Sequence, residues 1–240
     1  PRDAVKLMAK LLFLPIADEI ESGTYLLYDA ACGTGGMLTV AEEALQELAR
    51  QHGKQVATHL YGQEINAETY AICKADLLLK GEGDAADNIV GGPEHSTLAN
   101  DAFPSREFDF MLSNPPYGIR GKFASIDREK GYSETRAYAY QIRRGIDALR
   151  RGGIGVFLIP SGFVSGTSGE LRALRERVLL RAHFMGAFRL PSETDDGKSL
   201  FPGALLVTDV VFLRSRGGAI SRLPEADEYI AIMEVLETSV

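Results

Sequence analysis

Ser113-Asn114-Pro115-Pro116-Tyr117 is the stretch that decides the fold, and it follows the apolar run Phe108-Asp109-Phe110-Met111-Leu112. Two consecutive prolines lack a backbone N–H and fix φ, so a strand that reaches them ends in a stiff extended turn. Such a turn places Asn114 and Tyr117 at the end of a strand, where open α/β sheets bind ligands. An amide oxygen, a free proline carbonyl and an aromatic ring suit a planar group that carries an NH2. The alternative is a rigid connection without a chemical role.

A glycine-rich stretch, Asp29-Ala30-Ala31-Cys32-Gly33-Thr34-Gly35-Gly36, lies between an apolar run at residues 24–28 and an amphipathic helix predicted over residues 37–51. Glycines let the backbone approach a ligand closely, and the N–H groups at a helix start favour negative or electron-rich groups. Here an acid precedes Gly-x-Gly, unlike the Gly-x-Gly-x-x-Gly of dinucleotide enzymes. This spacing favours a cofactor with a cationic, amino-acid-like end, such as S-adenosylmethionine (SAM). A turn made only for packing is the alternative.

A second strand and helix follow, with an apolar run over residues 58–64 that ends in Glu64. An acid at the tip of the second strand is well placed to accept hydrogen bonds from both hydroxyls of a ribose, so Glu64 is our candidate for that contact. The alternative is a carboxylate in the first turn of a helix, where negative charge is favoured in any case. The helix is predicted over residues 67–79, with an inward face formed by Tyr70, Cys73, Leu77 and Leu78.

Asn100-Asp101-Ala102-Phe103 stands just before the strand predicted over residues 108–112. Asp101 is a candidate acceptor for the amino group of a cofactor's adenine, and Phe103 would pack beside the adenine ring. Alternatively, Asp101 serves only as a turn residue and Phe103 only as a core residue.

The remaining elements follow from apolar periodicity. We predict helices over residues 3–14 (stopped by Pro15), 134–150 (stopped by Arg150-Arg151-Gly152-Gly153), 169–181 and 223–236, and strands near 88–90 and over 154–160, 182–190 and 205–213. The last strand is expected to be antiparallel, because its connection is too short for a crossover helix. We therefore expect one α/β domain over residues 1–240, with residues 215–240 as a C-terminal tail.

Two segments carry basic side chains that suit either phosphate contacts or a solvated surface. Residues 118–135 read as a long loop beside the site, as expected of a mobile lid. The helix at 169–181 presents four arginines on its expected outer face: Arg172, Arg175, Arg177 and Arg181.

Composition excludes several classes of protein. No apolar run approaches the roughly 18–20 residues that span a bilayer, and Pro1-Arg2-Asp3 is not a signal-peptide start, so a soluble cytoplasmic protein is expected. Two cysteines fit a reducing cytosol, and four scattered histidines give no zinc site. The net charge of −7 argues against strong nonspecific binding of nucleic acid by this chain alone.

Together, residues 29–36, 62–66 and 113–117 resemble the amino-group DNA methyltransferases. The similarity is greatest to the methylation subunits of type I restriction-modification systems, and it covers residues 1–118, including the opening Pro-Arg-x-x-Val-x-Leu-Met. In that family a Tyr-Thr-Pro-Arg segment touches the cofactor at this point, so the chain is expected to be a fragment. Residues 150–214, with Phe188-Arg-Leu-Pro191 and Val207-Thr-Asp-Val-Val-Phe212, look more like adenine methylases fused to helicases.

The resemblance implies a Rossmann-like SAM-dependent methyltransferase fold, with a seven-stranded, mostly parallel sheet, an antiparallel last strand and helices on both faces. It implies that SAM is held by Asp29, Cys32, Gly33, Thr34, Gly35, Glu64, Asp101 and Phe103, without a metal. A target adenine flipped out of double-stranded DNA would donate N6–H to the Asn114 side chain and the Pro115 carbonyl of the Asn114-Pro115-Pro116-Tyr117 turn. Tyr117 would stack on the base. Phe201 forms the other wall of the base pocket or, alternatively, a packed turn.

The resemblance also implies partners, because no target-recognition domain is present in the sequence. A specificity subunit and a restriction subunit are the expected ones; alternatively, a missing part of the polypeptide supplies the specificity. Two alternatives remain at this point: a methyltransferase acting on protein glutamine or on RNA adenine, and a noncatalytic scaffold that binds DNA or a partner.

Overall fold

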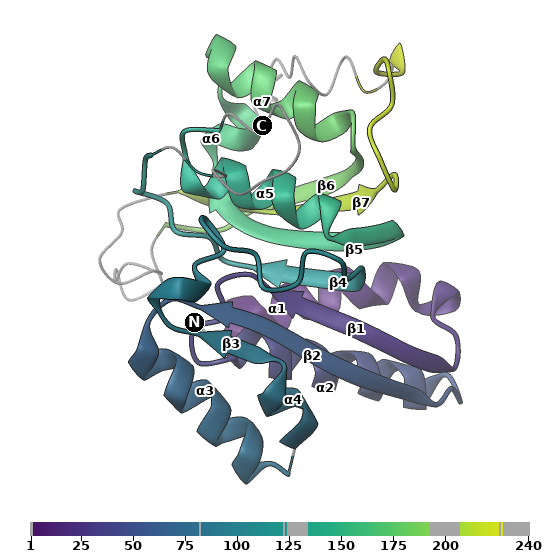
Figure 1. Ribbon diagram of the computed structural model, residues 1–240. Helices are drawn as coiled ribbons and strands as arrows, with labels where there is room; N and C mark the ends of the chain where they lie inside the picture. The colour runs from purple at the N-terminus through teal and green to yellow at the C-terminus, as the bar shows by residue number, and fades with distance from the viewer. Residues whose placement is uncertain are drawn as a thin grey trace.

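The computed structural model describes residues 2–81, 83–121, 123, 134–192, 207–225 and 227. Its centre is a seven-stranded sheet in the order β3-β2-β1-β4-β5-β7-β6 (Figure 1). The strands are β1 Gly23–Asp29, β2 Val56–Glu64, β3 Ile89–Gly91, β4 Phe108–Ser113, β5 Leu149–Pro160, β6 Ala182–Arg189 and β7 Thr208–Ser215. Strand β7 runs antiparallel to β5 and β6, whereas β3, β2, β1, β4 and β5 pair in parallel. The predicted mostly parallel sheet with an antiparallel last strand is confirmed.

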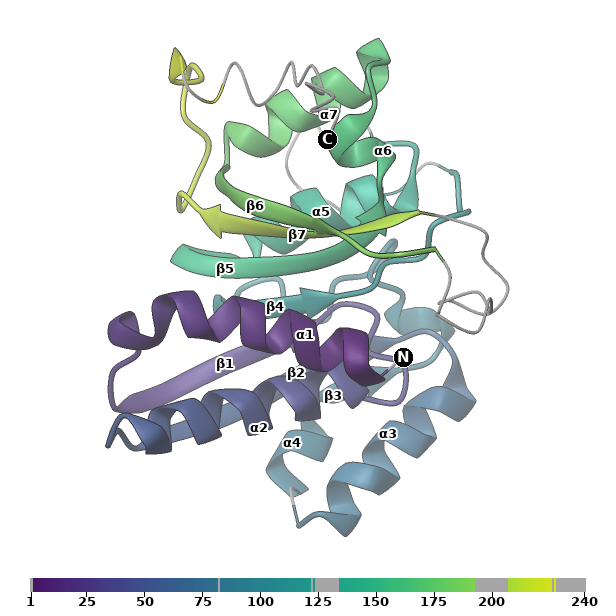
Figure 2. The ribbon, with the colours of Figure 1, turned by 180° about the vertical axis from the view of Figure 1, so that it is seen from behind.

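Helices cover both faces of this sheet, as expected. Helices α1 (Arg2–Phe13) and α2 (Gly36–Gln51) lie in front of the strands in Figure 2, and α5 (Ala137–Asp147), α6 (Gly162–Ser165) and α7 (Gly169–Leu179) cover the opposite face. Helix α3 (Ala67–Leu79) and the short α4 (Gly83–Asp87) pack against β2 and β3. Two 3-10 helices, η1 (Leu14–Glu19) and η2 (Pro93–His95), complete the described elements.

The two faces bury separate apolar clusters, and β4 contributes to both. Phe110 and Leu112 join the cluster beneath α1 and α2, whereas Phe108 and Met111 join the cluster beneath α5 and α7. The β4–β5 register shifts between Phe108 and Phe110. The irregularity in pairing therefore lies between two residues of the same parity that enter opposite layers.

Most element boundaries agree with the predictions. Helix α1 ends at Phe13, and Pro15 stands in the first turn of η1, where its missing N–H leaves no bond unmade. Helix α3 has the predicted bounds, and its Cys73 and Leu77 are buried. Leu78 does not face inward as predicted, because it is 57% exposed.

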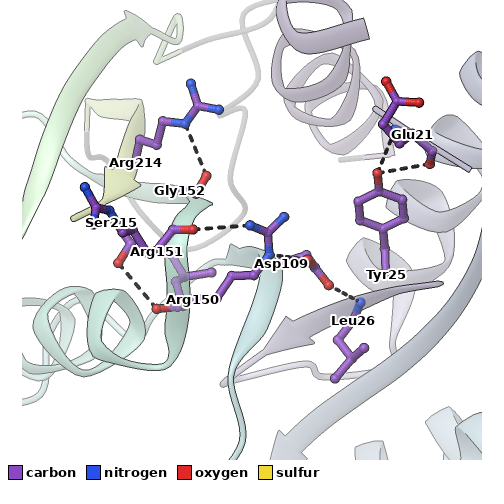
Figure 3. Close-up of polar contacts among 10 residues, drawn as sticks. Glu21, Tyr25, Leu26, Asp109, Arg150, Arg151, Gly152, Arg214 and Ser215 are labelled. Atoms are coloured by element: carbon purple, nitrogen blue, oxygen red, sulfur yellow. Dashed lines mark hydrogen bonds and ion pairs between the residues drawn. The ribbon is translucent and has the colours of Figure 1, made fainter. Parts of the chain in front are cut away.

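The predicted end of the helix before β5 is wrong. Helix α5 ends at Asp147, and Arg150, Arg151 and Gly152 already belong to β5. The reason lies across the sheet, where Asp109 of β4 accepts the Leu26 N–H at 2.8 Å and forms an ion pair with Arg150 (Figure 3). These contacts join the middle of β1 to the amino-terminal ends of β4 and β5, so the basic residues extend β5 instead of ending α5.

Three of the four arginines of the predicted outer face of α7 are engaged within the protein. Arg175 is only 2% exposed, and its Nη1 donates to the carbonyls of Phe163 and Gly166 at 2.9 and 2.8 Å. Arg177 binds both carboxylate oxygens of Glu134 at 2.9 Å. Arg181 forms an ion pair with Asp147. The expected row of phosphate-tracking or solvated side chains is therefore reduced to Arg172, which is exposed.

Several predictions fall on residues outside the described part of the chain. They are Phe201, most of the predicted lid at residues 118–135, and most of the helix expected over residues 223–236. Within the described part, no helix has both the length and the apolar character needed to cross a membrane.

Candidate functional site

The candidate site lies at the carboxyl ends of β1, β2 and β4. Chain connections leave β1 toward β2 and β3 on one side, whereas β4 and β5 lie on the other. This reversal is a topological switch point, where the loops after two adjacent parallel strands diverge and leave room for a ligand. Tyr28 of β1 pairs with Met111 of β4. Asp29 and the Asn114 turn therefore follow neighbouring strands, as the sequence predicts.

The turn after β1 requires its glycines. Gly33 and Gly35 have φ angles of +55° and +80°, in the left-handed region that favours glycine. A Cβ on Gly35 would also lie 2.6 Å from the Cys73 sulfur of α3. The Gly35 N–H donates to the Cys32 carbonyl at 2.8 Å, and the turn then leads into α2. Cys32 is buried beneath the turn, whereas Thr34 is exposed on it.

Asp29 is a buried carboxyl group with little compensation for its charge. It is 1% exposed, and its Oδ1 accepts the Ala31 N–H at 3.0 Å. Burial raises the pKa of Asp29 to about 7; the nearby Glu64 carboxylate adds to the rise, and the Ala31 N–H and Ser113 partly offset it. Among the described residues, no Lys or Arg forms an ion pair with Asp29.

This donor set fits the cationic end of SAM. A buried carboxylate is costly unless an opposite charge is bound beside it. The α-ammonium group of an amino-acid-like cofactor supplies such a charge. At Gly33 nothing lies within 4 Å of a Cβ position, so the backbone there is open to the chain that carries it.

Glu64 links the glycine turn to the start of α3. Its Oε2 accepts the Gly33 N–H and its Oε1 accepts the Asn66 N–H, both at 2.8 Å. Asn66, in turn, caps α3 by accepting from the N–H groups of Glu68 and Thr69. Glu64 therefore stands before the cap, at the end of β2, rather than in the first helical turn. Each of its oxygens keeps a lone pair on which a ribose hydroxyl can bind.

Gln63 is a site residue that the sequence reading missed. It is fully buried, and its Oε1 accepts from the Tyr28 hydroxyl at 2.9 Å and from the Ala102 N–H at 3.2 Å. Its Nε2 donates to the carbonyls of His95 and Asn100 at 3.0 and 3.1 Å. A polar residue directly before Glu64, on the buried face of a strand, was the available signal. Gln63 therefore holds the connection between β3 and β4 against the end of β2.

Asp101 makes the contacts expected of a turn residue, and Phe103 makes those expected of a core residue. Asp101 accepts the Phe103 N–H at 2.9 Å and forms an ion pair with Arg144. The Phe103 ring packs edge-on against Tyr28 and Tyr61, with centroids 5.9 and 5.3 Å apart. These are turn and core contacts, and an additional contact with a cofactor's adenine stays a prediction.

The Asn-Pro-Pro-Tyr turn presents Asn114 at the opening of the site. Asn114 is exposed, Pro115 is buried and Tyr117 is half-buried. The Tyr117 hydroxyl lies 2.5 Å from Asn114 Oδ1 and 3.0 Å from the carbonyl oxygen of Leu158 on β5. Burial raises the pKa of Tyr117, so its phenol is neutral at physiological pH. Across the described residues, no group of three or more His, Cys, Asp or Glu is placed to hold a metal ion.

Comparisons with known proteins identify the family of the chain. The family model described as N-6 DNA Methylase matches residues 1–216. "Defense against restriction protein B" of Escherichia phage P1 is 34% identical over 111 residues, which are 46% of this chain and 5% of the phage protein. The type I restriction enzyme MpnII methylase subunit of Mycoplasma pneumoniae is 28% identical over 124 residues, 50% of this chain and 21% of that subunit.

Solved structures share the fold. The type I restriction-modification methyltransferase subunit from Streptococcus thermophilus superposes with a TM-score of 0.67 at 22% identity, covering 90% of this chain and 44% of that one. The matched segment is thus less than half of each of these relatives.

Proposed function

We propose, from the premise that the chain belongs to the N-6 DNA methylase family, that it transfers a methyl group from SAM to the N6 amino group of adenine in DNA. One observation carries the proposal: the buried Asp29 and the exposed Asn114 follow the adjacent strands β1 and β4. A site for a cationic cofactor and a site for a planar amine therefore share one edge of the sheet.

The cofactor half of the site holds SAM by charge and backbone shape. Asp29 binds the α-ammonium group, and Gly33 and Gly35 let the methionine end lie against the backbone. Cys32 and Thr34 complete the turn. Glu64 accepts the ribose hydroxyls while keeping its bonds to the Gly33 and Asn66 N–H groups. Asp101 and Phe103 are proposed to flank the adenine ring of SAM.

The substrate half holds a flipped adenine. Extrusion from the duplex costs a few kcal/mol of unpairing and unstacking, which stacking on Tyr117 offsets. The Asn114 Oδ1 and the Pro115 carbonyl accept the two N6–H bonds. Phe201, which lies outside the described residues, is proposed as the second wall of the pocket.

The protein accelerates transfer by positioning. SAM, when bound, supplies a methyl group on a sulfonium sulfur. The N6 lone pair of adenine is delocalised into the ring and is a poor nucleophile. Two fixed acceptors at Asn114 and Pro115 draw the nitrogen toward tetrahedral geometry and direct its lone pair at the methyl carbon. On transfer, N6 would bond the methyl carbon as the C–S bonding pair stays on sulfur, and N6, held by Asn114 and Pro115, would release one proton to the surrounding water.

The wider assembly follows from the relatives. A restriction-modification system, with a specificity subunit that selects the DNA sequence and a restriction subunit that cleaves it, is the proposed context. The net charge of −7 supports this, because partners with basic surfaces would supply much of the grip on DNA. We place this activity in the cytoplasm, where a DNA substrate would be found.

The test separates cofactor binding from methyl transfer. Asn114→Ala is expected to abolish N6-methyladenine formation, measured by mass spectrometry of digested DNA, and to leave the calorimetric affinity for SAM within about twofold. Asn88→Ala, between α4 and β3, is the matched control with wild-type activity. Loss of SAM binding in Asn114→Ala would contradict the assigned role. Methyl transfer to a glutamine peptide or to RNA, with none to DNA, would favour the alternative substrates.

A further inference from the structure

The Tyr117 hydroxyl lies between two acceptors and can donate its hydrogen to either one. One is the carboxamide Oδ1 of Asn114 at 2.5 Å, and the other is the Leu158 carbonyl oxygen at 3.0 Å. A phenol has a single hydrogen, so it makes one strong hydrogen bond at a time. Rotation of that hydrogen about the C–O bond moves the bond from one acceptor to the other without moving a heavy atom.

The Leu158 carbonyl is available because β4 ends in prolines. The last β4–β5 pair is Ser113 with Phe157, and Leu158 lies one residue beyond it. Pro115 and Pro116 carry no N–H to continue the ladder. The phenol thus supplies a donor where the main chain has none, and ties the turn to β5.

We propose that the Tyr117 hydroxyl is a positioning group for Asn114, in a role separate from stacking by the Tyr117 ring. In the empty site its hydrogen bonds to Asn114 Oδ1 and fixes the carboxamide. When an adenine N6–H arrives at Oδ1, the hydroxyl hydrogen turns to the Leu158 carbonyl. Asn114 Oδ1 therefore has a donor in both states, the Leu158 carbonyl receives the hydroxyl in the second, and Asn114 does not have to reorient. This inference rests on the proposed function.

The hydroxyl acts on the rate of transfer rather than on cofactor affinity. In the described part of the chain, the Tyr117 hydroxyl bonds to Asn114 and Leu158 and not to Asp29, Gly33 or Glu64, so its removal is expected to leave SAM binding unchanged. Without the hydroxyl, the exposed Asn114 side chain rotates among several conformers, and only a fraction presents Oδ1 to N6. One ordinary hydrogen bond corresponds to a change of about tenfold.

Tyr117→Phe is the sharpest variant, because it keeps the ring and removes one oxygen atom. Its matched control is Tyr25→Phe at the start of β1, whose hydroxyl accepts the Glu21 N–H at 2.9 Å and donates to the Glu21 carbonyl at 3.1 Å (Figure 3). Both variants lose a bonded phenol, but only one lies at the site.

The rate is measured in a single turnover with saturating tritiated SAM and unmethylated bacterial DNA, using the purified protein. We expect Tyr117→Phe to transfer methyl about tenfold more slowly, with the SAM dissociation constant within twofold of wild type and Tyr25→Phe at the wild-type rate. A Tyr117→Phe rate within twofold of wild type would overturn the proposal. An equal loss in both variants would also overturn it.

A second readout does not depend on activity. Nitrogen-15 relaxation of the Asn114 side-chain amide should report an ordered carboxamide in the wild type and a mobile one in Tyr117→Phe. Equal order in the two proteins would overturn the positioning role. If the wild type transfers no methyl group to DNA, the proposed function fails, and this amide measurement alone then decides whether the hydroxyl orders Asn114.

Discussion

The two halves of the site are built by different means. The cofactor half is held by main-chain groups: Glu64 binds two backbone N–H groups, and Gln63 binds one N–H and two carbonyls. The substrate half depends on side chains, because prolines remove the backbone donors and the Tyr117 hydroxyl replaces one of them. Under the proposed function, backbone hydrogen bonds would hold the cofactor side of the site in a fixed shape. On the substrate side, the position of the Asn114 carboxamide would depend on one atom, the Tyr117 hydroxyl oxygen.

The largest expected effect is on SAM binding, and it comes from a change in the backbone of the glycine turn. Gly35→Ala should abolish measurable SAM binding in calorimetry, a loss of more than about 100-fold, because the residue has φ +80° and the new Cβ would meet the Cys73 sulfur at 2.6 Å. Gly36→Ala is the control, since nothing lies within 4 Å of a Cβ there and its φ is ordinary. Full SAM affinity in Gly35→Ala would show that the turn does not hold the cofactor.

A smaller effect is expected from the buried amide beneath that turn. Gln63→Leu leaves the Tyr28 hydroxyl, the Ala102 N–H and two carbonyls without their partner, and should lower the free energy of unfolding by about 3 kcal/mol. Urea denaturation measures the change. Gln51→Leu, on an exposed position of α2, should change stability by less than about 0.5 kcal/mol. Equal stability of the two variants would contradict the bracing role of Gln63.

The charge of Asp29 gives a pH dependence. Its pKa is raised to about 7 from an unfolded value near 4, so the folded protein holds this proton more tightly than the unfolded chain. Without a cation, its contribution to stability therefore falls as the pH rises from about 4 to 7. An ammonium group binds the ionised form, so SAM affinity should fall about tenfold per unit as the pH drops below 7.

Calorimetry in two buffers of different ionisation enthalpy measures this linkage as proton release on SAM binding near pH 6.5. Asp29→Asn should bind SAM weakly, with a flat profile over the same range. A flat profile in the wild type would mean that Asp29 does not meet the ammonium group.

The smallest effect is expected at the amino-terminal ends of β4 and β5, at the opposite end of these strands from the candidate site. Arg150→Ala removes an ion pair with Asp109, at a position where Arg150 is 48% exposed, and should lower stability by about 0.5 kcal/mol. Methyl transfer should not change, because this contact lies at the amino-terminal ends of the strands (Figure 3). A large loss of activity would mean that the two edges are coupled.

The same contrast explains what the sequence could reveal. The glycine turn and the double proline were readable, because backbone constraints restrict which residues can stand there. The antiparallel β7 followed from its short connection, whereas the order of the strands was not predicted. These local rules located Asp29, Glu64 and Asn114 at one edge before any contact was known.

Contacts between residues that are far apart in the chain could not be predicted from the sequence. Arg150-Arg151-Gly152-Gly153 has the composition of a helix end, but pairing of Asp109 with Arg150 places it in β5. Arg175 lies on a helix of regular periodicity, yet it is buried because two free carbonyls near α6 need a donor. Gln63 and the Tyr117 hydroxyl are likewise defined by partners more than 30 residues away. Periodicity carries no information on such partners.

The measurement that tests the central claim most directly follows the methyl group itself. The complete protein is incubated with SAM carrying a carbon-13 methyl group and with unmethylated DNA, and the digested nucleosides are analysed by mass spectrometry. The account predicts label on N6 of deoxyadenosine in the wild type and none with Asn114→Ala, although both proteins bind SAM. Label on cytosine, or no labelled nucleoside from a protein saturated with SAM, would contradict it.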